Sequence, residues 1–190
     1  MKRRNLVQAA AALAIAAPLG SFAAPAAPKA AGGKRIAVIF NSRTGHTRSV
    51  ARAIRAMTGA DLYELQLVEP YPDDYRRTTE IVKEELSRNY YRPIKPVKID
   101  LSRYDAVIFG SPTWWHHVAG PVRVWIQANK PQGKFIATFN DHGGGGEMEC
   151  RKDYEEMLKG NRLGTHLAIF GEVSESSSEV RLWLKENGLL

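Results

Sequence analysis

The chain has 190 residues and a formal net charge of +7, with 44% hydrophobic and 25% charged residues. This length suits one well-buried domain and is short for two, and the composition is that of a globular protein rather than a disordered or fibrous one. The sequence holds one cysteine, Cys150, which excludes an internal disulfide framework and any cysteine-rich zinc or iron–sulfur site.

The first 23 residues have the pattern of an export signal. A basic start contains Arg3 and Arg4, an alanine-rich apolar run covers residues 9–17, and Ser21–Ala23 offers small residues for cleavage. The apolar run is too short to span a bilayer, which takes about 20 residues. The arginine pair indicates twin-arginine export of a folded protein, with an ordinary secretory signal as the alternative. We therefore predict a periplasmic or secreted protein with no transmembrane segment in its mature chain; whether it is tethered to a membrane stays open.

Removal of residues 1–23 lowers the net charge, because three of the 27 basic residues and none of the 20 acidic residues lie there, which leaves 24 against 20, or +4. Such a mild excess does not indicate a nucleic-acid binder, for which a concentrated basic stripe is expected. Residues 24–33 are rich in alanine, proline and glycine without periodicity, which predicts a flexible linker. The folded domain is expected over residues 34–190.

Short apolar runs then alternate with segments of helical periodicity. Strands are predicted at Arg35–Phe40, Asp61–Leu67, Ala106–Gly110, Phe135–Phe139 and Leu167–Phe170. Helices are predicted at His46–Met57, Asp73–Arg88, Pro121–Asn129, Glu147–Lys159 and Ser176–Asn187. Four of the strands are almost continuously apolar, as in parallel strands buried on both faces, whereas residues 61–67 alternate and suit a sheet edge. The alternation predicts a doubly wound α/β fold, a five-stranded parallel sheet with helices on both faces.

In such a sheet, ligands bind beyond the carboxyl ends of the strands, so the loops there are the candidate site. The first loop follows the first strand and contains Ser42, Arg43, Thr44, Gly45, His46 and Thr47. Its hydroxyls, its glycine and the helix N-terminus that it opens suit one phosphate. It lacks the motifs of a nucleoside-triphosphate P-loop and of a dinucleotide site. An ordinary helix cap, with Thr44 satisfying the first turn, is the alternative.

The second loop contains Pro112, Thr113, Trp114 and Trp115, followed by two histidines. Adjacent side chains cannot both face one core, and an aromatic ring at a strand tip can stack on a flat heterocycle. The alternative is one tryptophan in the core and one at the rim. The histidines are expected to be loop residues, because zinc needs further donors at suitable spacing.

The third loop contains His142, Gly143, Gly144, Gly145 and Gly146. Consecutive glycines let the backbone approach a ligand closely and offer unhindered N–H donors. A flexible turn is the alternative interpretation. Together the three loops offer phosphate donors, a stacking ring and bare backbone at one end of the sheet, which describes a site for a planar mononucleotide.

The pattern Ser42-x-Thr44-Gly45-x-Thr47 after a first strand, joined to Pro112-Thr113-Trp114, resembles the flavodoxin family over residues 34–190. The resemblance implies the strand order 2-1-3-4-5 and non-covalent binding of FMN. It implies that the first loop, from Ser42 to Thr47, binds the FMN phosphate. It also implies that the second loop flanks the flavin ring on one side, and that His142, Gly143, Gly144 and Gly145 flank it on the other.

Two features depart from the family pattern. Flavodoxins are strongly acidic, whereas this mature chain is slightly basic, and the glycine-rich third loop looks more like that of flavodoxin-like quinone reductases.

The resemblance implies an electron carrier that acts with a redox partner protein or a small quinone-like acceptor. An FMN-dependent quinone or small-molecule reductase is the first alternative, and a flavin-free binding module is the second. No catalytic side chain or metal site is predicted, and Cys150 is expected to pack in a helix.

Overall fold

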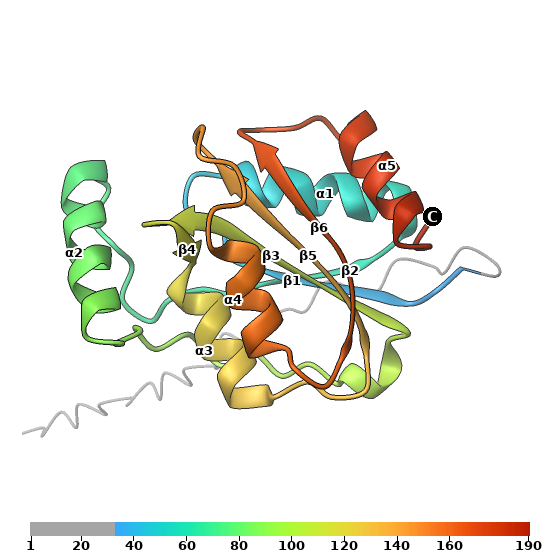
Figure 1. Ribbon diagram of the computed structural model, residues 1–190, viewed down its shortest axis with the longest axis horizontal. Coiled ribbons are helices and arrows are strands. Elements are labelled where there is room, and N and C mark those ends of the chain that lie inside the picture. The colour runs from blue at the N-terminus through green and yellow to red at the C-terminus, as the bar shows by residue number, and fades with distance from the viewer. Residues whose placement is uncertain (1–32) are drawn as a thin grey trace, which may run out of the picture.

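The computed structural model describes residues 33–190, so the predicted export signal and nearly all of the linker lie outside the described residues. Five strands form a parallel sheet in the order β2-β1-β3-β5-β6 (Figure 1). Their bounds are β1 Ile36–Phe40, β2 Asp61–Glu64, β3 Ala106–Trp114, β5 Phe135–His142 and β6 Arg162–Phe170. Numbered among themselves, these strands have the predicted order 2-1-3-4-5, and β2 lies at an edge as its alternating sequence predicted.

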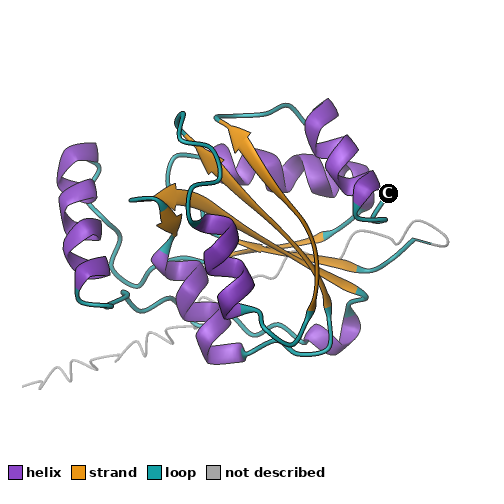
Figure 2. Cartoon of the chain, in the orientation of Figure 1, coloured by secondary structure: helices purple, strands orange, loops and turns teal. Residues whose placement is uncertain are grey.

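Helices cover both faces of the sheet, which confirms the doubly wound fold (Figure 2). Helices α1 (His46–Thr58) and α5 (Ser178–Glu186) pack on one face, and α3 (Gly120–Asn129) and α4 (Cys150–Met157) pack on the other. Helix α2 (Tyr75–Ser87) stands apart from the sheet, near the carboxyl ends of the strands, and buries only Thr78 and Val82 (Figure 1). Within residues 33–190, no helix is both long and apolar enough to cross a bilayer.

The two helical layers define two apolar cores that share the central strands. Alternate residues of β1 and β3 point to opposite faces, so Val38 and Ile108 pack with α1 and α5, whereas Ile39 and Phe109 pack with α3 and α4. Trp125 of α3 contacts the Phe109 ring at a centroid distance of 5.7 Å. Burial on both faces explains why these strands are continuously apolar in sequence.

Three strands are longer than the apolar runs predicted. β3 continues to Trp114 and β5 to His142, because Ser111 pairs with Asn140 and Pro112 with Asp141 beyond the apolar segments. β6 begins at Arg162, five residues before the prediction, and its first half is polar because this strand lies at a sheet edge. The short strand β4 (His117–Val118) pairs antiparallel with the end of β3.

Other boundaries were predicted too long. β2 ends at Glu64 rather than three residues later, because Leu67 pairs instead with Ile94 in an isolated antiparallel bridge. Helix α4 begins at Cys150 rather than Glu147, because the residues after the glycine run form turns. A single 3₁₀ turn (η1, Leu101–Arg103) precedes β3.

Candidate functional site

The first loop connects the end of β1 to the start of α1 and folds around Ser42. The Ser42 hydroxyl accepts hydrogen bonds from the backbone N–H groups of Gly45 (3.1 Å) and Arg48 (3.3 Å). Gly45 has φ of +106°, a left-handed conformation in which a side chain would be strained. Thr44 is exposed and its hydroxyl has no partner within residues 33–190, so the simple cap by Thr44 is not what forms here.

The backbone N–H groups of Thr44, His46 and Thr47 have no hydrogen-bond acceptor within the described part of the chain. They lie at the N-terminus of a 13-residue helix, where the peptide dipoles add a partial positive charge. Unsatisfied N–H groups at a helix N-terminus form an anion site, so this position can accept a phosphate.

Thr47 differs from the other predicted phosphate donors because its side chain is already bonded. It is 1% exposed, and its hydroxyl donates to the carboxyl group of Asp141 at the end of β5. Burial raises the pKa of Asp141, against the opposing effects of the Thr47 hydrogen bond and of His46 and His142. A carboxyl group therefore lies beside the predicted phosphate site, at a position that was not predicted from the sequence.

Arg43 joins the first loop to the segment before α2. Its guanidinium donates to the carbonyl oxygens of Pro72 (2.9 Å) and Asp73 (2.6 Å). These carbonyls orient the side chain without neutralising its charge. Arg43 consequently adds a fixed positive group beside the first loop.

The two tryptophans of the second loop both leave the apolar core. Trp114 is half-buried, and its ring meets Tyr71 edge-on at a centroid distance of 5.0 Å. Trp115 is 44% exposed, stacks on His116 at 6.1 Å and lies 5.0 Å from the Lys83 ammonium of α2. The expectation that they do not share one core is therefore confirmed.

Trp115 and His116 form the two-residue turn between β3 and β4. Their φ angles of +47° and +76° are those of a type I′ hairpin turn, in which asparagine and glycine are usual. A tryptophan there strains the backbone, and such strain concentrates at functional sites. The turn holds the Trp115 ring outside the fold, where it can contact a ligand.

The third loop is held by Asn140, a fully buried residue of β5. Its amide nitrogen donates to the Thr113 hydroxyl (2.7 Å) and to the Gly146 carbonyl (3.1 Å), and so links the second loop to the third. The loop itself contains Gly144 and Gly146 at φ of +131° and +73°, which require glycine. The glycine run is therefore anchored at Gly146 by the Asn140 side chain.

His166 of β6 completes this polar network. Asn140 Oδ1 is an acceptor, so the His166 nitrogen that contacts it, Nε2, carries the ring hydrogen and donates it (2.6 Å). The other ring nitrogen, Nδ1, therefore accepts from the Thr138 hydroxyl (2.8 Å). Burial lowers the pKa of His166 to about 4, so its imidazole is neutral at physiological pH. At the other end, the Thr113 hydroxyl donates to the Asp141 carbonyl (3.0 Å) and has no hydrogen left for a ligand.

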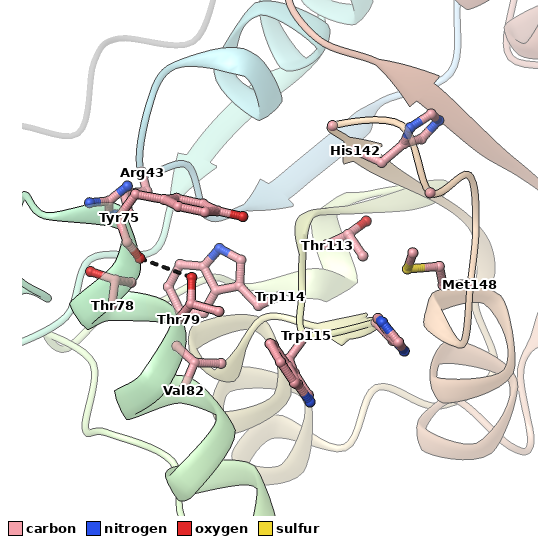
Figure 3. Close-up of a pocket in the computed structure, with 13 residues that line it drawn as sticks. Arg43, Tyr75, Thr78, Thr79, Val82, Thr113, Trp114, Trp115, His142 and Met148 are labelled. Carbon is pink, nitrogen blue, oxygen red and sulfur yellow. Dashed lines mark hydrogen bonds between the residues drawn. The ribbon is translucent and has the colours of Figure 1, made fainter.

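A cavity of about 330 Å³ lies between these loops and α2, within the size range of small-molecule sites (Figure 3). Figure 3 shows Tyr75 and Thr79 of α2 beside Trp114, with His142 and Met148 on the opposite side. Seven of the predicted site residues line this cavity: Arg43, Thr113, Trp114, Trp115, His142, Gly143 and Gly145. The wall formed by α2 was not predicted from sequence, because the polar residues of this helix look like those of any solvated helix.

The remaining predicted residues lie around this cavity. Ser42 lines a neighbouring cavity of about 290 Å³, which shares Arg43 and Trp114 with the larger one. The larger cavity and the smaller one are not lined by Thr44, Gly45, His46, Thr47, Pro112 or Gly144. Four of these form the anion site at the start of α1, Pro112 is a paired residue of β3, and Gly144 lies at the exposed tip of the third loop.

Other reactive chemistry is not assembled in the part of the chain that the structure describes. Within residues 33–190, no group of three His, Cys, Asp or Glu side chains is placed to hold a metal ion. Cys150 is fully buried in α4, and burial raises the pKa of its thiol to about 12, so it is protonated and inert. It packs in a helix as predicted.

The strand order and the loops at its carboxyl edge define a doubly wound α/β protein, in which this edge is the usual ligand site. The flavodoxin family model matches residues 35–187, and the chain belongs to the flavodoxin family. This confirms the family that the loop motifs predicted.

Solved structures show the same fold at low sequence identity. A protein from Bacteroides eggerthii proposed to be a flavoprotein is 22% identical, with a TM-score of 0.72 over 83% of this chain and 100% of its own. A flavoprotein from Lactobacillus acidophilus in complex with FMN is 22% identical, with a TM-score of 0.66 over 80% of this chain and 99% of its own. Two-electron reduced flavodoxin from Megasphaera elsdenii is 18% identical, with a TM-score of 0.50 over 82% of this chain and 99% of its own.

Proposed function

We propose that this flavodoxin-family protein binds FMN non-covalently at the carboxyl edge of its sheet and transfers electrons. The observation that carries the proposal is the position of Arg43, which belongs to the anion-accepting first loop and also lines the cavity with Trp114 and Trp115. A phosphate site and an aromatic-walled cavity therefore adjoin. The FMN complex of the Lactobacillus acidophilus flavoprotein supports FMN as the nucleotide.

The residues present fit FMN in three respects. The uncommitted N–H groups of His46 and Thr47 suit the phosphate, together with the exposed Thr44 hydroxyl. Indole rings suit one face of a planar ring system, and the braced glycine loop offers backbone on the other side. When bound, the flavin supplies the electron-transfer chemistry, while these residues bind it, orient it and exclude water.

An FMN-dependent reductase of quinones or similar small molecules is the second candidate. The observation in its favour is the part of the cavity walled by Tyr75 and Thr79 of α2, which gives a flat acceptor a place to stack near the flavin. The small acceptor and the protein partner are alternatives in this proposal. Export to the periplasm or beyond remains a prediction from residues 1–23.

Absorption of the purified protein tests the cofactor. Oxidised flavin has bands at about 375 and 450 nm, and we expect them to remain after gel filtration. In titrations of flavin-stripped protein, FMN should bind more tightly than riboflavin, which lacks the phosphate. Absence of the bands, with no binding of added FMN, would favour the flavin-free binding module.

Oxidation of the reduced protein by a soluble benzoquinone separates the carrier from the reductase. A carrier should give a rate that rises linearly with quinone concentration, whereas a reductase should saturate because quinone binds before it reacts. Thr79→Ala serves as the matched variant, since it alters the α2 wall and leaves the three flavin loops unchanged. A change in saturation in this variant would support the reductase.

A further inference from the structure

A buried carboxyl group lies against the anion site of the first loop. Asp141 is 7% exposed, and its side chain accepts the hydroxyl hydrogen of Thr47 in the first turn of α1. Its neighbours across the sheet are the apolar residues Pro112 of β3 and Ile169 of β6. The carboxyl group therefore has little water around it, at the helix end whose free N–H groups favour an anion.

This placement creates a conflict when a phosphate binds. Two anions close together in a poorly hydrated site repel each other, so an ionised Asp141 opposes the phosphate. The hydroxyl of Thr47 has one hydrogen, and while it is donated to Asp141 it is not available to a phosphate oxygen. A single proton on Asp141 removes both obstacles, because it cancels the charge and lets Asp141 donate rather than accept.

We propose that Asp141 is the proton-linked residue of the phosphate site, so that FMN is held tightly when Asp141 carries a proton and weakly when it is ionised. This inference rests on the proposed function, since it concerns the phosphate of FMN. Asp141 is a positioning residue whose protonation state decides whether the first loop can accept the phosphate. It makes retention of the cofactor depend on pH.

The groups that face Asp141 set the direction of the pH effect. From α1 these are Thr47 and His46, from the end of β5 His142, and from α4 the thiol of Cys150, which is protonated. Burial raises the pKa of Asp141 in the free protein, and a phosphate would raise it further. The complex then binds more protons than its separated parts, so FMN affinity falls as pH rises, by up to about tenfold per pH unit for one proton.

The phosphate of FMN titrates as well. Its monoester takes its second proton at about pH 6, which weakens its binding below that pH. This effect remains in an Asp141→Asn variant, so the difference between wild type and variant isolates Asp141.

The experiment measures FMN affinity by quenching of flavin fluorescence between about pH 5.5 and about pH 8.5, a range above the ordinary pKa of an aspartate, because burial raises the pKa of Asp141. Asp141→Asn keeps the shape of the side chain, carries no charge, and offers an amide N–H that can donate to Thr47 as a protonated carboxyl group can. At pH 8 it should bind FMN about tenfold or more tightly than wild type, and the two affinities should converge at low pH. Riboflavin should bind both proteins with no such difference. The control Asp100→Asn, beside η1 at the other end of the sheet, should match wild type.

Calorimetry in buffers of different ionisation enthalpy gives a second measurement. On binding FMN, wild type should take up more protons than Asp141→Asn, and neither protein should take up protons on binding riboflavin. Parallel pH profiles of wild type and Asp141→Asn, or equal proton uptake with riboflavin, would overturn the inference while leaving FMN binding intact. No FMN binding by either protein at any pH would overturn the proposed function itself.

Discussion

Replacement of His166 by glutamine should remove a pH-dependent part of the folding stability. The imidazole of His166 is partly buried on β6 and is hydrogen-bonded to Asn140 and Thr138 of β5, and this burial lowers its pKa. Its pKa is about 4 in the folded protein and about 6.5 in an unfolded chain. At a pH between these two pKa values, His166 binds a proton in the unfolded state and does not bind one in the folded state. Stability contributed by the neutral imidazole is therefore complete above pH 6.5 and is lost as pH falls toward 4.

The size of this effect follows from the two pKa values. Each pH unit between them corresponds to about 1.4 kcal/mol, so the ceiling is about 3 kcal/mol on going from pH 7 to pH 4. Partial access of solvent to the ring reduces the expected value to about 2 kcal/mol. Glutamine does not titrate in this range, yet its amide can still donate to Asn140 Oδ1.

Urea unfolding of both proteins at pH 7, 6, 5 and 4.5 tests the reasoning, with a range of about 2.5 pH units that covers most of the window. Wild type should lose more unfolding free energy than His166→Gln by about 2 kcal/mol across this range, after the carboxylate contributions common to both are subtracted. The exposed His116, replaced by glutamine, is the matched control and should follow wild type. An identical pH dependence in wild type and His166→Gln would refute the argument, because it would mean that the buried imidazole accepts its proton as readily as an exposed one.

Three further predictions address the phosphate site, the core and export. Thr44→Val removes an exposed hydroxyl donor, so FMN affinity should fall about ten- to a hundredfold in a fluorescence titration while riboflavin affinity stays constant. Gly110→Ala would place a methyl group 2.1 Å from the Phe139 ring, so urea unfolding should show a loss of about 1–3 kcal/mol, and an unchanged midpoint would contradict the packing. Replacing Arg3 and Arg4 with lysine should leave a flavin-loaded precursor inside the cell, detectable by fractionation, whereas normal export would favour the general secretory route.

The roles of two polar residues at the end of β5 were not predicted from the sequence. Asn140 and Asp141 follow the apolar run of β5 and lie beyond the predicted strand, which ended at Phe139 because its apolar run ends there. In the fold they continue the sheet, and Asn140 braces the third loop while Asp141 meets Thr47. The only sequence signal for them was the presence of polar side chains at the carboxyl edge, where ligands bind.

Helix α2 shows a second kind of limit. Its position along the chain was predicted to within two residues at each end from the helical spacing of its residues, and in the structure Asp74 caps its start. Its role as a wall of the cavity depends on where the segments before and after it lead, which local sequence does not encode. Periodicity reports which face of a helix is apolar, and α2 buries only two residues.

The sequence by itself determined the doubly wound order of elements, the edge position of β2 and the three loops at the carboxyl edge. These features follow from local properties. Strands that are buried on both faces must be continuously apolar, and the connection between two parallel strands usually contains a helix. Only the tertiary structure decided which polar groups meet. The hydroxyl of Thr47 and the carboxyl group of Asp141 are 94 residues apart in sequence. They come together because α1 begins where β1 ends and β5 extends to the same edge, and both strand register and helix packing fix that contact.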